Sequence, residues 1–155
     1  MNITEIKKDL FTLDTDKYVF AHNISCDCAM GAGVVVPFRN RHKNLRRSCV
    51  LCAGFKGADT LGTAFRYSDE NGVVYNMFTK EKVWHNSTNL KENEYLNNLK
   101  ICLIDLKRQM ILNNEKYLAI PKIGCGLDRC NWVDVKNLIE EVFNDTEIEV
   151  TGWYL

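Results

Sequence analysis

A strand, a glycine-containing loop and a helix follow one another between residues 117 and 143, and this pattern restricts the possible folds more than any other. The apolar start of the segment predicts a buried strand that ends at Pro121, because proline cannot extend a sheet ladder. Its second half predicts an amphipathic helix capped by Asn131. The loop between them carries two glycines and Asp128. Since backbone N–H groups of such a loop can converge on an anion, we expect a phosphate site with a carboxylate beside it.

A second transition of this kind lies earlier in the chain. The apolar run 18–24 predicts a buried strand and leads into a loop with Gly31 and Gly33. A helix is expected from Val34, and Pro37 fits only its first turn. Two such loops can bind the two phosphates of a nucleotide diphosphate, although glycine also serves simple tight turns. Neither loop has the Gly-x-Gly-x-x-Gly fingerprint and no P-loop is present, which argues against Rossmann dinucleotide binding and P-loop NTPases.

The rest of the chain predicts strands and helices in alternation. We expect a first strand within 1–8, a hairpin of 60–65 and 73–77, a helix from about 90 to 113, and a final strand at 147–154. In the final strand, Ile148, Val150, Gly152 and Tyr154 would face one way and Glu147, Glu149 and Thr151 the other. Residues 48–58 show no clear pattern. This order predicts a single domain over residues 1–155, with an α/β fold and a mixed sheet between helices.

The charge of the chain is balanced, with 20 basic and 20 acidic residues, so its overall field gives no reason to expect non-specific nucleic-acid binding. Residues 39–47 include five Arg or Lys, which we interpret as a solvated helix face, with a nucleic-acid contact as the alternative. There is no apolar run of 18 residues, and the seven cysteines are an odd number. We therefore expect a monomeric cytoplasmic protein with reduced thiols and no membrane partner.

Cysteines and histidines can bind a metal ion, but their spacing in this sequence does not favour a metal site. Cys49-x-x-Cys52 has no second pair at the spacing of a zinc ribbon, and we expect Cys102 to be packed as a small apolar residue. His22 lies in an apolar run and is expected in the core, whereas His85 lies on a loop and could touch a substrate. No metal ion or other cofactor is predicted.

Two segments resemble the macrodomain superfamily. They are residues 21–33, Ala-His-Asn-Ile-Ser-Cys-Asp-Cys-Ala-Met-Gly-Ala-Gly, and residues 121–129, Pro-Lys-Ile-Gly-Cys-Gly-Leu-Asp-Arg. The resemblance extends from Asp9 to Leu155 and is to the branch of the terminal ADP-ribose protein glycohydrolase and the related thymidine-linked ADP-ribose antitoxin macrodomain. The Asn-Ala-Ala-Asn stretch of the other large macrodomain class is absent. The resemblance implies a three-layer α/β/α macrodomain sandwich with a central mixed sheet and a cleft for ADP-ribose.

The resemblance also implies which residues contact ADP-ribose. Asp9, with Leu10 beside it, would bind the adenine amino group, and Leu155 would close over the adenine end. The loops at residues 30–34 and 123–127 would line the diphosphate and the distal ribose. The full set implied to contact the ligand is Asp9, Leu10, Ser25, Met30, Gly31, Ala32, Gly33, Val34, Thr79, Lys122, Ile123, Gly124, Cys125, Gly126, Leu127 and Leu155.

For hydrolysis, the resemblance implies a catalytic lysine and aspartate. The family's lysine follows a threonine at the end of the hairpin strand, which matches Thr79 and Lys80, and its loop aspartate matches Asp128. A neutral lysine amine can attack the anomeric carbon and form a Schiff base as a carboxylate leaves, while a carboxyl group moves the protons. We therefore expect a hydrolase that removes mono-ADP-ribose from Glu and Asp side chains of proteins and deacetylates O-acetyl-ADP-ribose.

Two alternative functions would also use a cleft that binds ADP-ribose. One is a reader module that binds ADP-ribose without turnover. The other is a hydrolase of ADP-ribose linked to nucleobases of DNA, which the basic residues 39–47 suggest. Residues 44–59 and 83–94 depart from the family's pattern, and both segments are expected near the distal ribose, where the acceptor of the ADP-ribosyl group would lie.

Overall fold

Residues 3–123 and 128–155 are described by the computed structural model, and six strands of these residues form one sheet in the order β1-β6-β5-β2-β4-β3. The strands are β1 (Thr4–Lys7), β2 (Val19–Ser25), β3 (Ala64–Asp69), β4 (Gly72–Lys80), β5 (Tyr117–Pro121) and β6 (Glu149–Tyr154). Strands β3 and β4 pair antiparallel and the other described pairs are parallel, so the predicted mixed sheet is confirmed. The carboxyl ends of β2, β4 and β5 therefore meet at one edge of the sheet, where open α/β sheets bind ligands.

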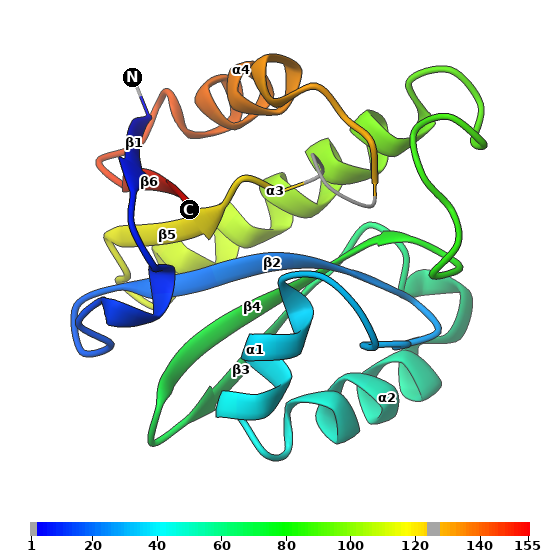
Figure 1. Ribbon diagram of the computed structural model, residues 1–155, viewed down its shortest axis with the longest axis horizontal. Helices are drawn as coiled ribbons and strands as arrows, with labels where there is room; N and C mark the ends of the chain where they lie inside the picture. The colour runs from blue at the N-terminus through cyan, green and yellow to red at the C-terminus, as the bar shows by residue number, and fades with distance from the viewer. Residues whose placement is uncertain (1–2, 124–127) are drawn as a thin grey trace.

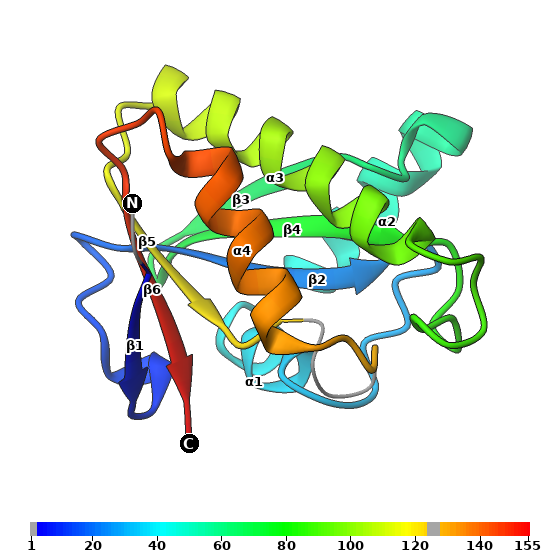
Figure 2. The same ribbon diagram turned by 90° about the horizontal axis from the view of Figure 1, so that it is seen from above.

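Helices cover both faces of this sheet (Figure 1). Helices α3 (Glu94–Leu112) and α4 (Trp132–Phe143) lie on one face, and Figure 2 shows them crossing it next to each other. Helices α1 (Val35–Arg41) and α2 (Leu45–Lys56) lie on the other, and the short 3-10 helices η1 (Leu10–Thr12) and η2 (Gly57–Asp59) complete the described elements. The three-layer α/β/α prediction is confirmed.

Apolar side chains fill the two spaces between these layers. Leu99, Leu103 and Leu106 of α3 pack in one buried cluster with residues of the sheet, and Phe38 of α1 packs in the other cluster with Phe20. Each fully buried side chain of this size contributes roughly 1.5–3 kcal/mol to folding. The sheet is thus fixed from both sides, which gives a rigid support to the loops at its carboxyl edge.

Strand β6 has the alternating faces that its sequence predicts, and residues of both faces are buried. It lies between β1 and β5, with helices over one face and η1 near the other, so Val150, Thr151 and Trp153 are all buried. Ile148 and Val150 belong to one buried cluster and Trp153 belongs to the other, which agrees with the predicted alternation, and the hydroxyl of Thr151 donates to the carbonyl of Leu118. A central parallel strand is covered on both faces, so a polar residue in it must find a partner in the protein.

The segment without a clear sequence pattern contains helix α2. Its buried residues Leu45 and Cys49 recur at a spacing of four, but Val50, Leu51 and Phe55 on the exposed side obscure the amphipathic pattern. The other predicted elements are confirmed with small shifts: α3 begins at Glu94 instead of about residue 90, and the hairpin turn lies between Asp69 and Gly72. Pro37 is the third residue of α1, within its first turn as expected.

Strand β4 carries one extra residue where it leaves the sheet. Ile24 pairs with Phe78, but the next residue of β2, Ser25, pairs with Lys80, so Thr79 is inserted between two paired positions. A bulge of this kind re-aims the side chains that follow it. The Thr79 hydroxyl donates to the hydroxyl of Tyr95 on α3 (3.2 Å), whereas Lys80 lines the cavity described below.

The stability of the fold is expected to depend on pH through His22, which is fully buried in β2 as predicted. Burial lowers the pKa of His22 to about 4, although a hydrogen bond between Nε2 and Asn76 (2.6 Å) acts in the opposite direction. Since the unfolded chain takes up this proton near pH 6.5 and the folded chain does not, stability falls as the pH decreases from about 6.5 to 4. The loss attributable to His22 reaches at most about 3 kcal/mol.

Urea unfolding of the wild type and of His22→Gln at pH 7 and pH 4.5 measures this contribution. The wild type should lose more stability between the two pH values than the variant does. Equal losses in the two proteins would show that His22 is not the group responsible.

Candidate active site

A cavity of about 400 Å³ opens at the carboxyl ends of β2, β4 and β5. Its lining comes from the end of β2, from the loop before α1, from the end of β4, and from the segment that follows β5. A second cavity of about 460 Å³ lies beside it between η1 and the end of β6. Val34 and Pro121 line both cavities, so the two form one elongated cleft. A cleft of this size is typical of a site for a nucleotide-sized ligand.

Lys80 and Asp128 form a buried ion pair in the first cavity. The ammonium Nζ of Lys80 lies 2.5 Å from Oδ1 of Asp128, and the two side chains are 8% and 12% exposed. The ammonium also donates to the backbone carbonyls of His85 (2.9 Å) and Val83 (3.0 Å). Together these contacts use all three N–H donors of the ammonium group. The sequence prediction that residues 80 and 128 lie together, 48 positions apart in the chain, agrees with this geometry.

Tyr95 of α3 holds the other oxygen of the Asp128 carboxylate. Its hydroxyl donates to Oδ2 of Asp128 and accepts hydrogen bonds from Asn23 (2.8 Å) and from Thr79. Burial and the negative charge of Asp128 raise the pKa of Tyr95 well above its usual range, so it remains a proton donor. Sequence reasoning missed Tyr95, because a tyrosine at the start of an apolar helix is indistinguishable from a packing residue.

Asp27 links the first glycine loop to the connection after β4. Its carboxylate accepts hydrogen bonds from the Ser25 hydroxyl (2.5 Å), the backbone N–H of Val83 (2.9 Å) and that of Ala29 (3.2 Å). Burial acts to raise the pKa of Asp27, but these hydrogen bonds outweigh burial and the pKa is lowered. Ser25, predicted to contact the ligand, lines the cavity with its hydroxyl directed at Asp27.

Two arginines of the basic segment 39–47 brace the same loop. Arg39 donates to the carbonyl of Met30 (2.8 Å), and Arg46 donates to the carbonyl of Cys28 (3.0 Å), a residue with a positive φ of 54°. The interpretation of this segment as a simple solvated face was therefore incomplete, because both guanidinium groups stabilise the shape of the loop. The predicted loop residues Met30, Ala32, Gly33 and Val34 line the cavity.

The second cavity contains the residues expected around adenine. Asp9, Leu10 and Leu155 all line it, together with Trp153 and Tyr154. One carboxylate oxygen of Asp9 caps η1 by accepting from the backbone N–H of Phe11 (3.0 Å), and the residue is exposed to solvent. Leu155 is 89% exposed and lies at the rim of this cavity. The elongated cleft therefore has an apolar end about Leu10 and Trp153 and, at the other end, the ion pair of Lys80 and Asp128.

Comparison with known proteins agrees with this arrangement. The ADP-ribose glycohydrolase OARD1 of Homo sapiens and that of Bos taurus are each 35% identical to this chain over 161 residues, which cover 99% of this chain and 91% of theirs. The macrodomain of Mycobacterium tuberculosis DarG superimposes with a TM-score of 0.82 at 23% identity, covering 99% of this chain and 97% of that one. This chain belongs to the macrodomain superfamily. No model of a protein family matches the sequence.

A further solved structure shares this fold. Thermosipho africanus DarTG, solved in complex with ADP-ribose, superimposes with a TM-score of 0.79 at 18% identity, covering 99% of this chain and 42% of that one. At this level of identity the likeness concerns the fold. The predictions of the superfamily and of its three-layer fold are thereby confirmed.

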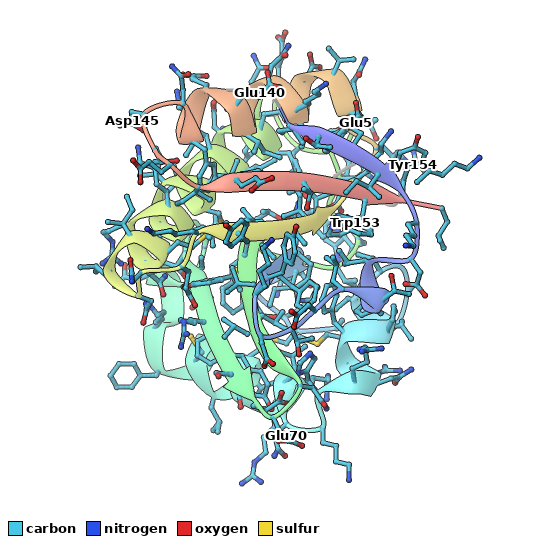
Figure 3. All side chains as sticks on the ribbon, turned by 90° about the vertical axis from the view of Figure 1, so that its left-hand side faces the viewer. Glu5, Glu70, Glu140, Asp145, Trp153 and Tyr154 are labelled. Carbon is cyan, nitrogen blue, oxygen red and sulfur yellow. The ribbon has the colours of Figure 1, made fainter. Side chains whose placement is uncertain are left out.

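Of the remaining residues predicted to contact the ligand, some line the first cavity and others do not. Ile123 and Lys122 line the first cavity, but the ammonium of Lys122 lies 3.1 Å from Glu5 and 4.1 Å from the ring centre of Tyr154. Figure 3 shows Glu5 and Tyr154 on the neighbouring strands β1 and β6. Thr79 contacts Tyr95 instead of the cavity, and Gly31 is exposed. The predicted contacts Gly124, Cys125, Gly126 and Leu127 lie outside the described residues.

The cysteines of this macrodomain have no metal-site arrangement in the described part of the chain. No three His, Cys, Asp or Glu side chains among residues 3–123 and 128–155 are placed to hold an ion. Burial raises the pKa of Cys26 and of Cys28 to about 11, so neither thiol is activated as a nucleophile. The described helices also include none with the length and apolar character needed to cross a membrane.

Proposed function

We propose that this macrodomain is an ADP-ribosyl hydrolase that releases mono-ADP-ribose from esters of Glu and Asp side chains. Its similarity over nearly the whole chain to a named ADP-ribose glycohydrolase supports hydrolysis of an ADP-ribosyl bond. The observation that carries the proposal is the buried pair of Lys80 and Asp128 at one end of the cleft. Such a pair supplies a nucleophile and a proton-transfer group at the same point.

The cleft suggests how ADP-ribose would lie. The adenine would occupy the apolar second cavity, where the exposed carboxylate of Asp9 can accept a hydrogen bond from the adenine amino group. The diphosphate would follow the loop of residues 30–34 that joins the two cavities, and the distal ribose would then reach Lys80 and Asp128. Because Arg39 and Arg46 hold this loop in place, the binding surface is formed before the ligand arrives.

The geometry supports a two-stage reaction. After Lys80 transfers a proton to Asp128, its lone pair attacks the anomeric carbon of the distal ribose, and the bond to the ester oxygen breaks with its electron pair leaving on the carboxylate. Asp128 then donates a proton to the ring oxygen and accepts one from the nitrogen of the adduct, so that the ribose ring opens and the adduct becomes a Schiff base. Water then adds to the C=N bond, and collapse releases ADP-ribose and the free amine of Lys80. The net reaction consumes one water and yields ADP-ribose and the free carboxylic acid.

The same chemistry extends to O-acetyl-ADP-ribose whose acetyl group is on the anomeric oxygen, because the acetate would then leave from the carbon that Lys80 attacks. A reader without turnover would not require a buried lysine–aspartate pair, whose desolvation is costly. Hydrolysis of nucleobase-linked ADP-ribose receives less support from the basic segment than its sequence suggested, since Arg39 and Arg46 bond to loop carbonyls.

Reductive trapping tests the proposal at the level of the covalent intermediate. Incubation with ADP-ribose and cyanoborohydride should reduce the Schiff base to a stable secondary amine, and peptide mass spectrometry should locate the adduct on Lys80. Lys82, an exposed lysine two positions along the chain, is the internal control and should remain largely unmodified. An adduct distributed over several surface lysines, with none favoured at Lys80, would contradict the mechanism.

A further inference from the structure

The ammonium group of Lys80 is held in a form that cannot react. Its three N–H donors point to Asp128, to the carbonyl of His85 and to the carbonyl of Val83, at 2.5, 2.9 and 3.0 Å. A nucleophilic amine has two N–H donors and a lone pair, so at least one of these three contacts must be lost before attack. The described structure is thus a resting state, and the two carbonyls take part in keeping it.

Both carbonyls flank one residue, Trp84. They belong to the connection between β4 and α3, residues 81–93, which extends beyond the end of the sheet (Figure 1). Trp84 itself is 66% exposed, and its ring packs edge-on against His85 with the ring centres 4.3 Å apart. Tryptophan is enriched at interfaces between molecules, because its ring is apolar while its N–H can reach a polar partner. Val83, the preceding residue, lines the catalytic cavity.

The same connection is also bonded to the aspartate of the catalytic pair. The backbone N–H of Ser87 donates to the carbonyl of Asp128 (2.9 Å), and the Ser87 hydroxyl donates to the carbonyl of Arg129. Val83 is anchored through its N–H to Asp27, while the carbonyl of Trp84 accepts from Asn89 (2.9 Å). A force applied to the Trp84 ring is therefore transmitted through backbone hydrogen bonds to the groups that hold Lys80.

We propose that Trp84 contacts the polypeptide that carries the ADP-ribosyl group, and that this contact draws the turn of residues 83–85 away from Lys80. The proposal rests on the proposed hydrolase function. The charge of the connection favours a polypeptide over a nucleic acid, because its two lysines, Lys82 and Lys91, are balanced by Glu81 and Glu92. A single-stranded nucleic acid would need a net positive groove beside the aromatic ring.

Kinetics on two substrates test this coupling. For Trp84→Ala, kcat on an ADP-ribosylated polypeptide with a Glu linkage should fall about tenfold, because binding energy from a remote part of the substrate no longer frees the lysine. The rate on O-acetyl-ADP-ribose, which has no chain to reach Trp84, and the Kd for free ADP-ribose should remain within about twofold. Phe55→Ala is the matched control, since Phe55 is an aromatic side chain that is 92% exposed on α2. It should change neither rate.

Results that differ from these expectations would each lead to a different conclusion. Equal losses on both substrates would show that Trp84 merely stabilises the turn, and no loss on either would show that it makes no contact, so both results overturn the inference. A loss confined to an ADP-ribosylated oligonucleotide would identify nucleic acid as the partner and overturn the choice of polypeptide. If the wild type hydrolyses neither ester, the proposed function fails as well; if it hydrolyses both, only the role of Trp84 is in question.

Discussion

Turnover of an ADP-ribosyl ester is expected to fall by about a thousandfold or more when Lys80 is replaced by methionine, because loss of a nucleophile removes the covalent route altogether. Methionine retains the apolar length of the side chain in the buried site, so the cavity should keep its shape. Binding of ADP-ribose measured by calorimetry should change by only a few fold, since the adenine and diphosphate contacts lie elsewhere in the cleft. The variant would then behave as a binding protein.

Lys82→Met provides the control for this experiment. Lys82 lies two residues beyond Lys80 and is exposed, so its replacement should leave both turnover and binding unchanged. Initial rates with a Glu-linked ADP-ribosylated protein, together with thermal melting of each variant, separate loss of chemistry from loss of folding. Full turnover by a folded Lys80→Met protein would disprove the role of this lysine.

The second large effect is expected from Tyr95→Phe, which removes one oxygen from the interior. Asp128 then loses the hydrogen bond to Oδ2, and Asn23 loses the acceptor of its amide. We expect kcat to fall roughly 10- to 100-fold, because second-layer partners of a reacting carboxylate fix its orientation. Affinity for ADP-ribose should stay nearly constant.

Tyr75→Phe is the matched control for this loss of a hydroxyl group. Tyr75 is also buried and donates to a carboxylate, that of Glu115, but neither residue lines the cleft. Each variant is expected to lose about 1–3 kcal/mol of stability from unpaired polar groups. If Tyr75→Phe lowered kcat as much as Tyr95→Phe, the effect would reflect general destabilisation. Full kcat in a folded Tyr95→Phe protein would count against its action on Asp128.

The proximity of Lys80 and Asp128 was predictable from the sequence because the two residues lie in recognisable contexts. Lys80 follows a threonine at the end of a hairpin strand, and Asp128 follows a glycine loop, so the resemblance to macrodomains identified both. Tyr95 has no such context. Its position at the start of α3 fits an apolar helix face, and nothing local to residue 95 indicates that the helix passes beside residue 128. A residue that acts by orienting another side chain can be identified only from the folded structure, where the two residues lie next to each other.

The fold itself was predicted best where periodicity and burial agree. Helices α3 and α4 and the strands β2 and β5 have continuous apolar patterns, and the structure contains them close to the expected bounds. Helix α2 escaped prediction because apolar residues occupy its solvent side as well as its buried side. In this element, local pattern and tertiary position conflict.

The inserted residue of β4 has an evolutionary consequence. Because Thr79 interrupts the pairing of β2 with β4, Lys80 emerges on the side of the cavity, and deletion of a single codon there would turn the lysine towards α3. The rest of the nucleotide cleft would keep its lining. On the proposed mechanism, one change in strand length would therefore convert a macrodomain that removes ADP-ribose into one that only binds it. Variation in the length of β4 among related genes would record such switches.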